Sequence, residues 1–194
     1  MLLVSLSVHE AAHAWTADRL GDPTARLLGR ITLNPMAHID WIGTVLFPLV
    51  ALYSGVPLLG WAKPVPVNWQ NLRSPRRDFA MVAAAGPASN LILATLGAGV
   101  FGLAGAALSG MAAELVLRFI LMNVFLAVFN MIPVPPLDGG NVASGLLPLP
   151  LARLVDQLRP YGFLILYALL FTGVLGKYVF PIALRIATFL ISVF

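Results

Sequence analysis

Long apolar runs constrain this chain more than any other feature of its sequence. Of its 194 residues, 59% are hydrophobic and only 10% are charged, whereas soluble domains carry about 25% charged residues. A run of about 20 apolar residues is long enough to cross a bilayer as a helix. The runs that approach this length cover residues 1–20, 41–60, 79–108, 115–132, 163–176 and 178–194. The sequence therefore predicts an integral membrane protein.

Two basic loops separate the first three runs and determine the expected topology. Residues 21–40 mix turn residues with a short β-branched piece, and residues 61–78 alternate Pro and Val, which is typical of extended chain. Both loops carry Arg or Lys, so the positive-inside rule places both on the cytoplasmic side. With Pro48 and Gly55 inside it, the run over residues 41–60 is then expected to be a hairpin or re-entrant excursion.

The predicted fold is therefore all-α, with about five to six membrane segments and short extended or re-entrant elements between the first and third apolar runs. The third and fourth runs go out and back, which returns residues 130–138 to the side where the first helix ends. The first residues lack a basic leader and a small-residue cleavage site, so no cleavable signal is expected. We expect one integral membrane domain over residues 1–194.

Composition excludes several classes of site and partner. The chain has no cysteine, which excludes disulfides, thiolate metal ligands and cysteine nucleophiles. Its net charge of +4 comes from 12 Lys and Arg against 8 Asp and Glu, which lie mostly between the apolar runs. A nucleic-acid-binding protein would need a contiguous basic face. The expected partner is therefore the lipid bilayer and not nucleic acid, and no pattern indicates an oligomeric state.

Two histidines and a glutamate interrupt the first apolar run in the stretch VHEAAHAW. His9 and His13 are four residues apart and share one face of a helix, with Glu10 about 100° round from them. Two neutral imidazoles at this spacing can bind one Zn²⁺ and leave positions for a third protein ligand and a water. The neighbouring glutamate can accept a proton from that water. Because an acidic residue inside a membrane helix costs about 2.5 to 3.5 kcal/mol, the pattern favours metal binding over chance or packing.

A hydrolytic zinc site needs a third protein ligand, and the sequence offers few. His38 and Asp40 lie in the first loop, where local hydrogen bonds explain them equally well. Glu114 has an arginine at the i+4 position of a helix ion pair, and Asp156 belongs to an amphipathic surface stretch. Asp138 differs, because prolines precede it and two glycines follow it. Broken backbone at membrane depth is tolerated only where it is buried in protein or lines a watery cavity.

These motifs resemble the site-2 protease family of intramembrane zinc metalloproteases, in its short prokaryotic form. The matching blocks cover most of the first 140 residues and are HEAAH at 9–13, GDPTARLLGRITLNPMAHIDWIG at 21–43, GWAKPVPVN at 60–68, AGPASN at 85–90 and FNMIPVPPLDGG at 129–140. The resemblance implies a zinc-dependent endopeptidase. Its substrates would be membrane proteins, cleaved in or near a transmembrane helix.

The resemblance also implies a role for individual residues. Glu10 is the implied catalytic base. Asn130 matches the position that hydrogen-bonds the substrate carbonyl or stabilises the oxyanion, and Asn90 matches a second polar group near the active site, for substrate binding or for structure. The implied ligands of a single Zn²⁺ per chain are His9, His13 and Asp138.

By the same resemblance, residues 1–140 form the catalytic core and residues 141–194 supply C-terminal membrane helices. The expected location is the prokaryotic plasma membrane, with the active site toward the cytoplasm. Two alternatives stay open. One is another membrane zinc peptidase with a glutamate as third ligand, which only Glu114 could supply. The other is a nonproteolytic metal-binding membrane protein with a degenerate site, although a site that only binds metal needs no base such as Glu10.

Overall fold

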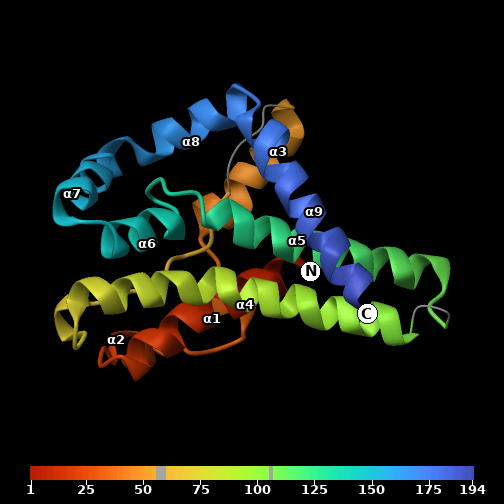
Figure 1. The fold of residues 1–194 in the computed structure, drawn as a ribbon, viewed down its shortest axis with the longest axis horizontal. Helices are drawn as coiled ribbons and strands as arrows, with labels where there is room; N and C mark the ends of the chain where they lie inside the picture. Colours follow the sequence, from red (N-terminus) through yellow and green to blue (C-terminus); the bar gives the residue numbers. More distant parts are fainter. Residues whose placement is uncertain (56–59, 105–106) are drawn as a thin grey trace.

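The computed structural model describes residues 1–55, 60–104 and 107–194, and these residues form helices and connecting loops without any strand (Figure 1). The prediction of an all-α fold is confirmed. The helices are α1 (Leu2–Arg19), α2 (Thr24–Leu27), α3 (Phe47–Ser54), α4 (Pro75–Ala104), α5 (Gly110–Asn130), α6 (Asp138–Leu146), α7 (Leu149–Gln157), α8 (Gly162–Phe171) and α9 (Phe180–Val193).

Four helical segments of the described chain are long and apolar enough to cross a membrane. The third begins at Leu149, well before the apolar run expected from residue 163, because α7 and α8 follow one another with one 3-10 turn between them. Helix α1 carries Glu10 and two further charged residues and is not among the four. The four segments are Pro75–Ala104, Gly110–Asn130, Leu149–Phe171 and Leu175–Val193.

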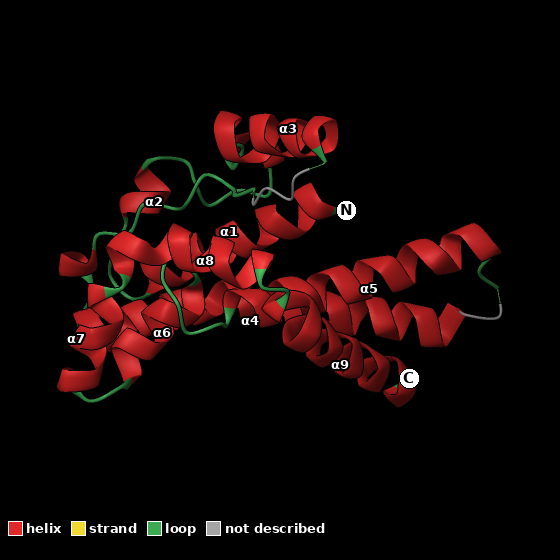
Figure 2. Cartoon of the chain, turned by 90° about the horizontal axis from the view of Figure 1, so that it is seen from above, coloured by secondary structure: helices red, strands yellow, loops and turns green. Residues whose placement is uncertain are grey.

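Helix α4 is the centre of the molecule, because it packs against α1, α5, α6 and α9. Figure 1 shows α1 and α4 running side by side, and Figure 2 shows α4 and α5 as a long pair that extends toward one end of the molecule. Small residues allow these helices to approach closely. The buried core where α4, α5 and α9 meet consists of Ala94, Ala98, Ile120, Val124, Ala183 and Ala187.

The run expected as an excursion over residues 41–60 begins with a π-helical turn, Trp41–Leu46, that continues into α3. The Asp40 carboxylate accepts hydrogen bonds from the first free N–H groups of this turn at 2.8 and 3.1 Å. Helix α3 ends at Ser54, and the next residue, Gly55, has a φ of 68°, which suits glycine. The apolar helix Trp41–Ser54 is shorter than the four long segments. Residues 56–59 of this run, and residues 105–106 of the next, lie outside the described residues.

Residues 60–68, here named the strap, connect this region to the 3-10 turn Trp69–Asn71 without regular secondary structure. The first loop holds both ends of the strap. At one end, Arg30 donates to Lys63 O at 2.7 Å, and Lys63 N–H donates to His38 O at 2.9 Å. At the other end, Asn68 N–H donates to the buried carboxylate of Asp22 at 2.6 Å. The strap is therefore fixed to the first loop at both ends.

Candidate metal centre

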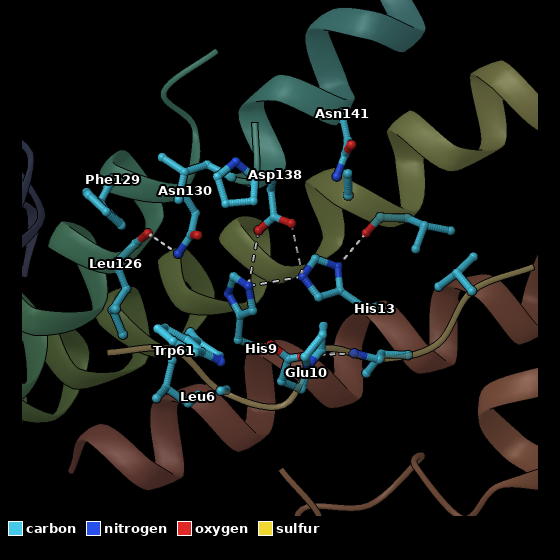
Figure 3. A pocket seen from close by; sticks show the side chains of 18 of the residues that line it. Leu6, His9, Glu10, His13, Trp61, Leu126, Phe129, Asn130, Asp138 and Asn141 are labelled. Atoms are coloured by element: carbon cyan, nitrogen blue, oxygen red, sulfur yellow. Dashed lines mark hydrogen bonds and ion pairs between the residues drawn. The ribbon is translucent and has the colours of Figure 1, made fainter. Parts of the chain in front are cut away.

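Three side chains of metal-ligand type from α1 and α6 meet in one cluster (Figure 3). One nitrogen from each of His9 and His13 and one oxygen of Asp138 all lie within 4.8 Å of one another. His9 Nε2 lies 3.1 Å from Asp138 Oδ2, His13 Nε2 lies 3.4 Å from Asp138 Oδ1, and the two Nε2 atoms are 3.0 Å apart. Both histidines are buried. Residues 125 positions apart in the sequence are thus brought together at the N-terminus of α6.

The glycines after Asp138 explain how α6 reaches the histidines. A Cβ on Gly139 would collide with the backbone of Met131 and Ile132, and a Cβ on Gly140 would lie 2.6 Å from Pro135 N. Only residues without a side chain therefore let α6 begin directly against the proline-rich turn that follows α5. This close approach places the Asp138 carboxylate over α1.

The hydrogen bonds of the two Nδ1 atoms determine where each imidazole carries its proton. His13 Nδ1 lies 2.7 Å from Val82 O, and a carbonyl oxygen can only accept, so a neutral His13 carries its proton on Nδ1. His9 Nδ1 lies 2.7 Å from the side-chain oxygen of Asn90. Both Nε2 atoms are then left with lone pairs that point at each other and at Asp138.

The cluster is therefore made of acceptors alone, and this is the chemistry that a cation satisfies. Asp138 Oδ2 is buried and receives no hydrogen bond from the part of the chain that the structure describes. Tetrahedral zinc with bonds of about 2.0 to 2.1 Å holds its ligand atoms about 3.3 Å apart. The observed separations of 3.0, 3.1 and 3.4 Å are close to that value. Two nitrogens and one carboxylate fit a zinc site with a position left open.

Helix α4 supports the histidine pair with three residues spaced four apart, which share one helix face. Val82 meets His13, Asn90 meets His9, and Gly86 lies between them. A Cβ built on Gly86 would collide with the Nε2 atoms of both imidazoles. Glycine is therefore required where the α4 backbone passes the cluster.

Glu10 lies beside the cluster but bonds to the strap. Its Oε2 accepts a hydrogen bond from Val65 N–H at 3.1 Å, and the side chain is buried. In Figure 3 this carboxylate lies apart from the Asp138 carboxylate and the two imidazoles that form the cluster. Glu10 is thus placed next to the metal ligands without joining them.

A cavity of about 440 Å³ opens onto the cluster. Asn130 borders it from the end of α5 and donates to Leu126 O at 2.9 Å, and Asn141 of α6 also borders it. Asn90 does not line this cavity. Most of the wall is apolar, including Trp61, Val65, Val67, Phe129, Phe163 and Leu166.

The other candidate ligands named from the sequence lie outside the cluster. His38 is buried against Thr32 O at 2.8 Å, and Asp40 caps the helical turn that follows it. Glu114 pairs with Arg118, as its spacing predicts, and both are exposed. The Asp156 pair with Arg159 is exposed too.

Sequence reasoning missed the groups that support the ligands. Gly86 stands in the AGPASN block, in which the resemblance assigns a role only to the asparagine. Asn123, which bonds to Asn90 at 3.0 Å, was detectable as a polar residue inside an apolar run. The contributions of Val82 O and Val65 N–H come from backbone groups, which no side-chain pattern reveals.

Comparison with known proteins identifies the family. The model of Peptidase family M50 matches residues 98–172. The "Putative zinc metalloprotease YwhC" of Bacillus subtilis is 40% identical over 185 residues, which covers 92% of this chain and 81% of YwhC. The chain belongs to peptidase family M50. This is the site-2 protease family that the sequence motifs resemble, so the chain is an integral membrane zinc metalloprotease.

Other M50 relatives match over much of this chain. The "Putative zinc metalloprotease Rip2" of Mycolicibacterium smegmatis is 32% identical over 189 residues, covering 93% of this chain and 68% of that protein. The "Putative zinc metalloprotease Rip3" of Mycobacterium tuberculosis is 32% identical over 148 residues, covering 76% of this chain and 30% of that protein. No solved structure matches the chain significantly.

Proposed function

We propose that His9, His13 and Asp138 hold one zinc ion per chain and that Glu10 is the base that activates water for cleavage of a transmembrane segment. The observation that carries this proposal is the buried cluster of acceptors, with Nε2 atoms 3.0 Å apart and a carboxylate across them, next to a separate glutamate at the edge of a cavity. A site that only binds metal has no use for that second carboxylate.

Zinc bound there supplies a Lewis acid for the scissile carbonyl and for the attacking water. The residues of the chain do the rest. Glu10 takes the proton from water and passes it to the leaving amine. Val65 N–H donates to Oε2 of Glu10, and we assign the uptake of the proton to the other oxygen, Oε1. Asn130 uses one side-chain hydrogen on Leu126 O, and its second hydrogen is available for the developing oxyanion.

The proposed substrate is a membrane protein that presents a transmembrane helix. Carbonyls within a helix are bonded internally, so the helix must unwind locally before a peptide bond can be attacked. Two segments that the sequence predicts to be extended, residues 31–33 and residues 65–67, are proposed to receive the unwound chain by edge pairing. Of these, Val65 and Val67 border the cavity, which favours the strap.

The proposed topology keeps both basic loops on the cytoplasmic side of a prokaryotic plasma membrane, with the active site toward that side. Residues 41–60 then enter and leave the same face, and the chain has five to six membrane segments when α1 is included. We propose a single domain over residues 1–194. Its core is residues 1–140, while Phe163 and Leu166 of the C-terminal part help to wall the cavity.

Cleavage by purified protein in detergent tests this function. A panel of membrane-spanning peptides is incubated with the protein as purified, after treatment with a chelator, and after zinc is restored. We expect cleavage to disappear with the chelator and to return with zinc. Cleavage that continues in the metal-free protein would contradict a zinc-dependent mechanism.

A further inference from the structure

A line of buried amide groups leads from His9 away from the cavity, through Asn90 of α4 to Asn123 of α5. Both asparagines are 0% exposed. The side-chain oxygen of Asn90 lies 2.7 Å from His9 Nδ1, and its nitrogen lies 3.0 Å from Asn123 Oδ1 and 3.4 Å from Ser5 O. Neither asparagine lines the cavity. Their polar groups therefore lie behind His9, on the side of Nδ1 and away from the Nε2 atom that faces the cluster.

Two backbone carbonyls fix the direction of each hydrogen bond in this line. The side-chain nitrogen of Asn123 lies 2.9 Å from Phe119 O, and a carbonyl only accepts, so Asn123 must turn its NH₂ group there. The side-chain oxygen of Asn123 then faces Asn90 and accepts a hydrogen bond from the NH₂ group of Asn90. Ser5 O demands the same orientation of Asn90. The Asn90 oxygen is left facing His9, whose Nδ1 must carry the proton.

The proton on Nδ1 decides whether His9 can bind metal through the nitrogen that faces the cluster. The other neutral tautomer would place a proton on Nε2, between His9 and Asp138, and would block coordination. His13 is fixed by a backbone carbonyl, Val82 O, which cannot rotate. The amide of Asn90 could reverse its ends, and two contacts of its nitrogen oppose this. The bond to Asn123 Oδ1 at 3.0 Å is the shorter of the two, and the contact with Ser5 O is 3.4 Å long.

We propose that Asn123 is a positioning residue of the metal centre: by holding the amide of Asn90 in one orientation, it fixes His9 in the tautomer that binds metal. The proposal rests on the proposed role of His9 as a zinc ligand. It extends the metal site to α5, which supplies none of the three proposed ligands.

Packing alone does not explain an asparagine at this position. Ile120 and Val124, on either side of Asn123 along α5, belong to the apolar core shared with α4 and α9. A polar side chain within an apolar span is costly unless it is partnered. Asn123 uses its oxygen on Asn90 and its nitrogen on Phe119 O. Phe119 belongs to the same helix as Asn123, so the hydrogen bond with Asn90 is the one that joins Asn123 to another helix. We infer that this bond is the reason for a polar residue at this position.

Nitrogen NMR of ¹⁵N-histidine-labelled protein tests the proposal directly, because the chain has three histidines. In the parent protein, with and without zinc, we expect His9 and His13 both to be protonated on Nδ1. In Asn123→Leu without zinc, we expect the His9 signals to move toward a mixture of tautomers while the His13 signals stay in place. His13 is thus an internal control for general loss of structure.

Zinc affinity, measured by competition with a chromogenic chelator, gives the second readout. We expect Asn90→Leu to weaken zinc binding about 10- to 100-fold and Asn123→Leu about two- to tenfold. The double variant should bind as Asn90→Leu does, since Asn123 acts through Asn90. Val124→Ala shortens the neighbouring core side chain and leaves the hydrogen bonds of both asparagines in place. This control variant should bind zinc as the parent does.

An unprotonated Nδ1 on His9 in the parent spectrum would overturn the proposal, even if Asn123→Leu does not fold. So would losses that add in the double variant, or an Asn123→Leu protein with parental zinc affinity and an unchanged His9 signal. Failure of the zinc site itself is a separate result: it appears as parental zinc content in His9→Ala, whereas the tautomer is read in metal-free protein.

Discussion

Asp138 provides the decisive test of the proposed ligand set. It is the proposed ligand that comes from α6, whereas both histidines come from α1. Purified parent protein should contain about one zinc per chain. Asp138→Ala removes the only carboxylate within 3.4 Å of the two Nε2 atoms among the described residues, so zinc content, measured by atomic emission, should fall sharply. Asp156→Ala, which removes an exposed carboxylate, is the matched control. A metal content equal to the parent's in Asp138→Ala would show that the third ligand is another residue.

Glu10→Gln separates catalysis from metal binding. Gln keeps the size of the side chain, and its amide oxygen can still accept from Val65 N–H, but it cannot take a proton at neutral pH. Zinc content should therefore stay at the parental value, while cleavage of a membrane-spanning peptide falls about 10²- to 10⁴-fold. Both quantities are measured on the same preparation. Parental cleavage would rule out Glu10 as the base, and lost zinc would give it a structural or coordinating role.

Gly86→Ala tests the contact between α4 and the imidazoles. The added Cβ would collide with both Nε2 atoms, and relief of an overpacked site of this kind costs about 1 to 3 kcal/mol. We therefore expect zinc affinity to fall about 10- to 100-fold. Gly110→Ala is the control, because a Cβ there meets nothing within 4 Å. Equal affinities in the two variants would mean that α4 can shift to make room.

Among the connecting elements, the first loop is tied to the 3-10 turn after the strap by one carboxylate. Burial would raise the pKa of Asp22, but hydrogen bonds from Thr24, Asn71 and Asn68 outweigh it and lower that pKa. A carboxylate with a lowered pKa in the fold stabilises it above its unfolded pKa of about 3.9. That stability is lost as the pH falls through the lowered folded value.

The prediction at this element is a pH-dependent gap between parent and Asp22→Asn. At pH 6 the variant should be less stable by about 1.5 to 3 kcal/mol, the worth of a hydrogen bond to a charged group. Thermal unfolding in detergent at several pH values measures the gap, which should close as the pH drops below about 4. A gap that stays constant from pH 6 to pH 3 would mean that the charge of Asp22 contributes nothing.

The elements differ in how much of them the sequence could predict. The histidine pair follows from helical periodicity, and the role of Asp138 was indicated by the broken backbone around it. The position of α6 was not predictable in this way, because it depends on how closely Gly139 and Gly140 approach the preceding turn. Apolar runs located α4, α5 and α9, but the amphipathic start of the Leu149–Phe171 segment is not a continuous apolar run, so the expected run began only at residue 163.

For the whole molecule, the prediction concerns the side of the membrane on which the loops lie. Single cysteines replacing Arg26 and Arg73 are easy to interpret, because the parent has none. We expect an impermeant thiol reagent to label both in inverted membrane vesicles and neither in intact cells. Labelling of the two positions from opposite faces would contradict the re-entrant assignment of residues 41–60.

The contacts of Val82, Gly86 and Asn90 with the two histidines also set the registration of α1 against α4. One residue of a helix corresponds to a slide of about 1.5 Å, which would break both hydrogen bonds and move Gly86 away from the imidazoles together. Without a cation, the lone pairs facing each other across 3.0 Å repel. The two Nδ1 bonds and the fit of Gly86 oppose that repulsion, so we expect α1 and α4 to keep this registration in protein stripped of its metal. The helix pair is therefore aligned before the metal binds.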